Sequence, residues 1–302
     1  MQRLKGWRWV LLVLALALPL AGCGDDEAEP TDAGGDTQQE EEFPADSTMA
    51  AIQENGEIVI GVKYDVPPFG FVEPGSDDPQ GFDVDLGTII AEELGVEPVF
   101  REAISDNRIP FLQNGEVDLI LSTMTITTDR DAEIDFSRPY YIAHQRILVP
   151  KGSDIGGLED LGGKKVCTVV GSTGEATLKD KAKDAKRTTV DSYSECLELL
   201  QNGAVDAEIS DDVILAGQVI QDDSLELVGD FLTDEPYGVG IPDGQTDMQG
   251  FVDGVIEGTF EDGTWDDLYQ EWVGQYTGEE ADHPERLTLQ DALDLFPCVE
   301  FC

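Results

Sequence analysis

Positive charge is scarce in this chain of 302 residues. Lys and Arg number 18 against 64 Asp and Glu, which gives a formal net charge of -46 at pH 7. This balance argues against a nucleic-acid partner and against adsorption to anionic lipid, because both require a basic surface. So acidic a surface suits a salty environment, where dissolved ions screen the repulsion between its charges.

Histidine is almost absent as well. The only two, His144 and His283, do not lie at the spacing of metal ligands. We therefore expect neither a metal site nor a cofactor, although a zinc site stays open as an alternative role for the cysteines.

The N-terminus lacks an apolar run long enough to span a bilayer. A basic start is followed by an apolar run over residues 10–18, which is typical of a secretion signal. Leu20-Ala21-Gly22-Cys23 then looks like a bacterial lipobox, in which the cysteine is lipidated and becomes the first mature residue. We predict that residues 1–22 are a lipoprotein signal peptide and that Cys23 anchors the protein to the outer face of the cell membrane. An uncleaved anchor helix is the alternative.

Residues 23–56 are predicted to form a disordered acidic tether. The segment from Gly24 to Glu54 has 11 acidic residues and no Lys or Arg. Such a composition does not bury enough apolar surface to fold.

Four cysteines remain after Cys23, and an even set in an exported protein suggests disulfides. Three pairings are possible. We favour Cys167 with Cys196 and Cys298 with Cys302, because each pair is then local in the sequence.

From Glu57 onward the chain alternates between strand and helix patterns, which favours an α/β fold. Strands are predicted over 58–62, 117–121, 166–170 and 205–209. An apolar face predicts a helix that ends at Gly95, and Ser192 with Glu195 forms a capping box at the start of another. Two apolar stripes predict helices over 248–256 and 265–272.

One heptapeptide occurs twice, as LQNGEVD at 112–118 and as LQNGAVD at 200–206. Each copy is typical of a helix end, a glycine cap and a following strand. Two similar lobes explain this repeat economically, and chance similarity between two common Asn-Gly turns is the alternative.

Polar loops follow three predicted strands, at 122–125, 171–174 and 210–212. Ligands of open α/β sheets bind beyond the carboxyl ends of strands, so we expect a cleft at these loops. A helix predicted to start at about Glu175 would add free N–H groups that favour an anion.

Gly81-Phe82-Asp83-Val84-Asp85-Leu86, continued by Ile90-Ala91 and Leu94, matches a known signature. The chain resembles the polar amino acid (family three) extracellular solute-binding proteins of ABC importers over about residues 57–273. The resemblance implies a type II periplasmic-binding-protein-like fold, in which two α/β lobes are joined by two crossover hinge segments. One lobe would comprise 57–142 plus 240–273 and the other 143–239, with 274–302 as a C-terminal extension.

The resemblance also implies a ligand site. Arg130 stands where the family has the arginine that forks onto the ligand α-carboxylate, a task that suits its planar donors. Asp211 stands at the acid that receives the α-ammonium, and Thr173 at a second contact to the α-carboxylate. The neighbouring positions complete the predicted set: Ser122, Thr123, Thr125 and Ser172.

Lys63 and Arg108 resemble the glutamate and aspartate branch of the family, where they would face a side-chain carboxylate. If Arg130 and Asp211 hold the amino-acid backbone, these two cations are left unpaired in a closed cleft. Unpaired buried cations are costly, so the ligand should bring a second carboxylate. We therefore predict glutamate or aspartate, with a neutral amino acid such as glutamine as the alternative.

Each of these residues also has an ordinary structural interpretation. Arg130 could be an ion-pair partner within the fold, and Lys63 and Arg108 could be surface charges. Asp211 could be the N-cap of a helix over 212–221, a role compatible with ligand binding.

The leading hypothesis is a monomeric receptor without catalysis, which passes an amino acid to the membrane permease of an importer. A dehydratase on the same fold is the runner-up, but neither histidine lies in a predicted ligand loop and no nucleophile–base pair is visible. A sensor or adhesin ectodomain is the third hypothesis.

Overall fold

The computed structural model describes residues 43–45, 47–275 and 284–295. Helices and strands alternate along the chain, as predicted. The strands are β1 (Glu57–Val62), β2 (Asp65–Val66), β3 (Gly70–Val72), β4 (Pro79–Gln80), β5 (Glu97–Glu102), β6 (Leu119–Ile120), β7 (Asp135–Pro150), β8 (Lys165–Val169), β9 (Lys186–Val190), β10 (Ala207–Asp211), β11 (Leu225–Val228) and β12 (Asp234–Ile241).

The α-helices are α1 (Thr48–Asn55), α2 (Phe82–Leu94), α3 (Arg108–Gln113), α4 (Thr128–Asp131), α5 (Thr173–Lys181), α6 (Tyr193–Gln201), α7 (Asp212–Gln221), α8 (Thr246–Asp262), α9 (Thr264–Tyr269) and α11 (Leu289–Leu295). Short 3-10 turns lie at Leu158–Leu161 and Pro284–Arg286, and a π-helical turn lies at Gln270–Gly274. None of the described helices has the length and apolar character needed to cross a membrane.

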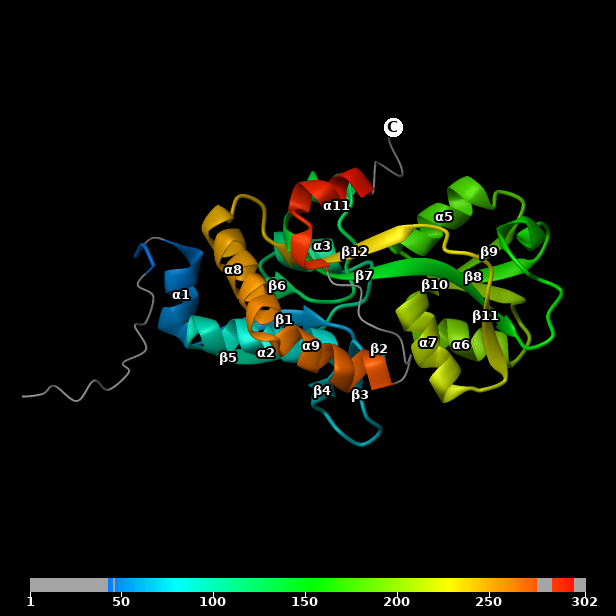
Figure 1. Ribbon diagram of the computed structural model, residues 1–302, viewed down its shortest axis with the longest axis horizontal. Helices are drawn as coiled ribbons and strands as arrows, with labels where there is room; N and C mark the ends of the chain where they lie inside the picture. The colour runs from blue at the N-terminus through cyan, green and yellow to red at the C-terminus, as the bar shows by residue number, and fades with distance from the viewer. Residues whose placement is uncertain (1–42, 46, 276–283, 296–302) are drawn as a thin grey trace, which may run out of the picture. The chain divides into compact units, whose positions relative to one another are not determined.

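Two long strands, β7 and β12, connect the two halves of the main sheet (Figure 1). The strand order is β5-β1-β6-β12-β7-β10-β8-β9, and β11 also pairs with β7. We call β1–β6 with the helices packed on them the first lobe, and β8–β11 with α5–α7 the second lobe. The lobe boundaries predicted after residues 142 and 239 fall inside β7 and β12, so these antiparallel partners are the two crossover segments. The two-lobe α/β fold predicted from the sequence is confirmed.

The repeated heptapeptide performs the same task in both lobes. Its glycine adopts a left-handed φ in each copy. Its final aspartate then accepts a hydrogen bond from the first strand of its own lobe: Asp118 Oδ2 lies 2.8 Å from the N of Val59, and Asp206 Oδ2 lies 2.7 Å from the N of Lys165. A chance match between two turns does not account for this shared pairing.

The same aspartates explain why two strands differ from their predicted bounds. Strands were expected over 117–121 and 205–209, but β6 covers only Leu119–Ile120 and β10 starts at Ala207. In each lobe the aspartate accepts a hydrogen bond from the first strand of that lobe, and regular strand pairing begins only at the residue after the aspartate.

The predicted disordered tether is wrong at its C-terminal end. Helix α1 occupies Thr48–Asn55, with Ser47 as its N-cap. Met49 and Ile52 are buried in the core of the first lobe, and this burial offsets the cost of ordering the segment. The acidic run before these apolar residues dominates the mean composition of the segment and hides them. Cys23 and the rest of the predicted signal peptide lie outside the described residues.

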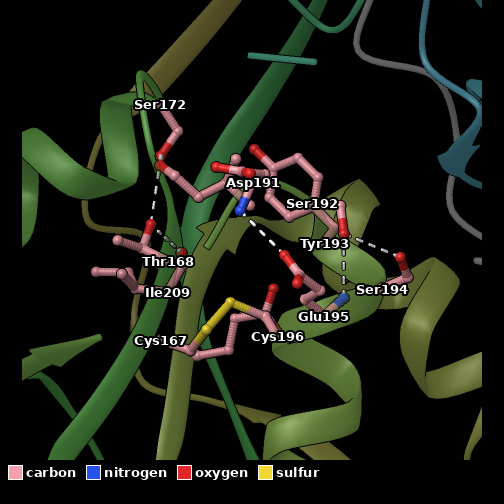
Figure 2. Close-up of a disulfide and its surroundings, with 12 residues drawn as sticks. Cys167, Thr168, Ser172, Asp191, Ser192, Tyr193, Ser194, Glu195, Cys196 and Ile209 are labelled. Atoms are coloured by element: carbon pink, nitrogen blue, oxygen red, sulfur yellow. Dashed lines mark hydrogen bonds between the residues drawn. A yellow bond between two sulfur atoms is a disulfide. The ribbon is translucent and has the colours of Figure 1, made fainter. Parts of the chain in front are cut away.

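A disulfide joins β8 to α6 in the second lobe (Figure 2). Cys167 and Cys196 have their Cα atoms 5.7 Å apart, and both side chains are fully buried. This half of the predicted pairing is confirmed. Cys298 and Cys302 lie outside the described residues.

Candidate ligand site between the two lobes

Two arginines of the first lobe reach one carbonyl of the second lobe. The Nη2 atoms of Arg130 and Arg108 lie 3.0 Å and 3.4 Å from the O of Gly171. Arg130 follows the helix cap formed by Thr127, and its Nη1 donates to the O of Thr125 at 2.7 Å. The predicted carboxylate fork therefore lies where the lobes meet, half-buried.

Arg108 already has partners within the protein. Its Nε donates to the O of Ser105 at 3.1 Å, and its Nη1 donates to the O of Ser122 at 2.9 Å and of Thr123 at 3.1 Å. Burial, and then the nearby charge of Arg130, lower the pKa of Arg108 to about 9, so it stays charged at neutral pH. The premise that Arg108 is unpaired is therefore wrong, because its guanidinium holds the loop that follows β6.

Lys63 lies beside Arg108 and is only 2% exposed, so it is not a surface charge. Its Nζ donates to Ser105 Oγ at 2.8 Å and lies 5.7 Å from the ring centre of Tyr193 in the second lobe. Burial, and then the charge of Arg108, lower the pKa of Lys63 well below its usual value.

Thr123, in the loop that follows β6, has a strained backbone. Thr123 has a φ of 45°, in the left-handed region that β-branched residues rarely adopt. Its N–H donates to Asp83 Oδ2 at 2.9 Å, and Tyr140 Oη donates to the other oxygen at 2.7 Å. Asp83 is fully buried, and burial raises its pKa to about 7 despite these hydrogen bonds. The sequence signature contains Asp83, but only the structure gives it this supporting role.

A second buried carboxylate, Glu235 of β12, connects both lobes to the crossover strands. Its Oε2 accepts from Thr125 Oγ1 at 2.6 Å in the first lobe and from Thr173 Oγ1 at 2.8 Å in the second. Its Oε1 accepts from Gln145 Nε2 and Thr233 Oγ1, both at 2.7 Å. Sequence reasoning missed Glu235, because one acid among 64 carries no local signal.

Asp211 ends β10 and faces the same region. Its Oδ2 accepts from Tyr237 Oη of β12 at 2.6 Å, and its side chain makes no cap bond to α7 although it holds the N-cap position. Burial, and then the charge of Glu235, raise the pKa of Asp211 well above its usual value. A ligand cation beside Asp211 would favour its ionised form.

Three of the predicted hydroxyls donate within their own lobes, and one of them is Thr123 Oγ1, which donates to the O of Ser122 at 2.9 Å. Ser122 Oγ donates to the O of Ala103 at 2.9 Å, and Ser172 Oγ donates to the O of Val169 at 2.6 Å. Ser172 is also the N-cap of α5, which places that helix start two residues before the predicted Glu175. Apart from Ser172, the predicted ligand residues all have polar atoms in the network described above.

A pocket of about 240 Å³ lies beside Arg130 and Gly171, and its lining does not include Lys63, Asp211 or Glu235. Its wall also includes Ser105, Asp106 and Glu133. The described part of the chain has no cluster of His, Cys, Asp and Glu that could hold a metal ion.

The lobe junction combines basic and acidic side chains. Three basic and four acidic residues are buried or half-buried there: Lys63, Arg108, Arg130, Asp65, Asp83, Asp211 and Glu235. Arg130 of the first lobe and Asp211 at the end of a second-lobe strand provide a basic and an acidic group from opposite lobes.

The comparisons with known proteins identify the family. Residues 58–275 match the family model of bacterial extracellular solute-binding proteins, family 3, and the chain belongs to that family. It is 38% identical over 273 residues to the ABC transporter glutamine-binding protein GlnH of Bacillus subtilis, covering 89% of this chain and 97% of that protein. It is 33% identical to the glutamate-binding protein GluB of Corynebacterium efficiens, covering 85% of this chain and 87% of that one.

Solved structures agree with this assignment. An ancestral arginine-binding protein bound to glutamine is 38% identical, with a TM-score of 0.70, and covers 72% of this chain and 98% of its own. The chain is thus an amino-acid-binding protein of the kind that serves ABC importers.

Proposed function

We propose that this protein captures L-glutamine between its lobes and delivers it to the permease of an ABC importer. Arg130 would hold the α-carboxylate, supported by Thr125 and Thr173, and Asp211 would receive the α-ammonium. Lys63 would donate to the side-chain oxygen of the ligand. Arg108 and Asp83 would position the loop that carries these contacts.

The hydrogen bonds of Arg108 and the acidic side chains of the lobe junction carry this proposal. Because Arg108 already donates to three carbonyls and four acidic side chains are already present, the junction does not require a second ligand carboxylate. Glutamate would add a negative charge beside these acidic side chains, and arginine would add a positive charge beside Lys63 and Arg108, and burying an additional charge is costly. The preference for glutamate or aspartate rested on two unpaired cations, and the bonds of Arg108 remove one of them.

The long-range electrostatic field of the protein also favours glutamine over glutamate. A formal net charge of -46 repels an anionic ligand during its approach, whereas a net-neutral amino acid approaches without this penalty. Glutamate is the second candidate, because Lys63 could still pair with a carboxylate and one relative is a glutamate-binding protein.

The remaining features belong to the same proposal. Cys23 would carry the lipid that holds the monomeric receptor at the outer face of the cell membrane, and the acidic segment after it would serve as a tether. Catalysis is not expected, because neither histidine is among the residues that the family resemblance assigns to the ligand.

Isothermal calorimetry with the purified protein and a panel of amino acids tests the ligand. We expect glutamine to bind at least about tenfold more tightly than glutamate, and arginine not to bind. A tenfold preference for glutamate would overturn the glutamine assignment. Arg130→Ala should abolish binding of every amino acid, because it removes the shared anchor, and selective loss of one ligand would contradict that role.

A further inference from the structure

A carboxylate of the first lobe caps a helix of the second lobe. Asp65 Oδ2 lies 2.8 Å from the N of Tyr193, 3.1 Å from the N of Ser194 and 3.4 Å from Ser194 Oγ. Tyr193 and Ser194 begin helix α6, directly after its N-cap, Ser192 (Figure 2). A helix N-terminus favours a negative charge, so this contact between the lobes is attractive.

A second close approach lies next to the first. Gly217 occupies the middle of α7, and a Cβ placed there would lie only 1.8 Å from the O of Pro67. Glycine in a helix interior costs roughly 1 kcal/mol relative to alanine, so the position needs another justification. The justification is this backbone contact, because any side chain would keep the first-lobe segment 65–67 away from α7.

The two contacts lie next to the cleft but outside the charged network. Tyr193 shows the connection: its backbone N–H meets Asp65, while its ring lies 5.7 Å from Lys63 Nζ. Asp65 itself has hydrogen bonds only to the start of α6 among the described contacts of its side chain.

We propose that Asp65 and Gly217 form a closing latch, which sets how long a bound amino acid is retained. The inference rests on the proposed function and concerns the same site. The latch joins groups from two lobes, so it forms when the lobes close and breaks when they open. Asp65 makes no hydrogen bond to the residues assigned to the ligand, although its charge favours the protonated form of nearby Lys63, so it slows release of amino acids with different side chains alike.

The test measures binding and release of L-glutamine and L-glutamate by wild-type protein, Asp65→Ala and Gly217→Ala. Asp77→Ala, at an exposed loop position, and Gly254→Ala, where an added Cβ meets nothing, are matched controls. Asp65→Ala should raise both dissociation constants roughly tenfold or more, through faster release, because charge-assisted bonds are lost. The ratio of the two constants should change by much less than either constant.

Gly217→Ala gives an independent readout. Its Cβ blocks closure, so binding should weaken at least as much as in Asp65→Ala, while the ligand-free protein melts no lower than wild type because alanine favours the helix. If Gly217→Ala does not fold, the Asp65→Ala measurements decide alone.

Unchanged release rates in Asp65→Ala would overturn the latch. A change in the glutamine-to-glutamate ratio as large as the change in either constant would also overturn it, because Asp65 would then act on the ligand through Lys63. A wild-type preference for glutamate would overturn the glutamine proposal instead, and the comparison of rates would still decide the latch.

Discussion

Replacing Arg108 by alanine should destabilise the fold and weaken all amino acids alike. The guanidinium is 2% exposed and donates to the carbonyls of Ser105, Ser122 and Thr123. Removing it leaves three buried acceptors without these donors, each at a cost of about 1–3 kcal/mol. Water that enters from the cleft can donate to some of these carbonyls, so we expect the free energy of unfolding to fall by about 3–5 kcal/mol in total.

The assay combines urea unfolding with calorimetry. Arg108→Lys keeps a positive charge but lacks the planar fork, so it should recover only part of the stability. The exposed Arg187 provides the control: Arg187→Ala should change stability by less than about 0.5 kcal/mol. If Arg108→Ala unfolds like wild type and loses only glutamate binding, then Arg108 contacts the ligand and our interpretation is refuted.

Three further predictions concern other parts of the chain. The Cys167→Ala/Cys196→Ala double variant should lose about 3–4 kcal/mol in urea unfolding, since the bond spans a sequence separation of 29; a loss below about 1 kcal/mol would contradict this. Glu208 Oε2 and Gln218 Oε1 are both buried and have no hydrogen-bond partner. Burial raises the pKa of Glu208 to about 8, and a protonated Glu208 could donate a hydrogen bond from Oε2 to Gln218 Oε1. The folded state then binds more protons than the unfolded state between about pH 4.5 and 8, so stability falls as pH rises through that window; Glu208→Gln should flatten this slope, and an identical slope in both proteins would reject the assignment. Cys23→Ser should release the protein from the membrane or leave it unprocessed, and membrane-bound protein of mature size in a fractionation experiment would rule out the lipid anchor.

Local chemistry explains what the sequence could predict of the fold. The glycine after α2, with φ of 76° at Gly95, ends the helix where the apolar stripe ends. The capping box at Ser192 starts α6, with Ser192 Oγ accepting from the N of Glu195. These features depend on residues a few positions apart, so they can be read without knowledge of tertiary structure. The predicted strand bounds were less accurate, because Asp118 and Asp206 accept hydrogen bonds from strands that are distant in the sequence.

The candidate site shows where such reasoning stops. Family resemblance located the positions of Lys63 and Arg108 but not their partners. The carbonyls that bind Arg108 belong to loops brought together by the fold, and a sequence does not show which backbone atoms surround a cation. Counting cations alone therefore predicted an acidic ligand, whereas counting their buried partners does not.

Glu235 shows how the same chemistry extends beyond the cleft. It lies in a crossover strand, yet its Oε2 is shared by Thr125 of the first lobe and Thr173 of the second. Burial raises the pKa of Glu235, while these hydrogen bonds and the charge of Arg130 oppose that effect. An α-carboxylate bound at Arg130 would reduce the support that Arg130 gives to Glu235, and an α-ammonium at Asp211 would relieve the repulsion from that side. A zwitterionic ligand supplies both charges together, so it perturbs the carboxylate that joins the lobes less than an ion of either sign would.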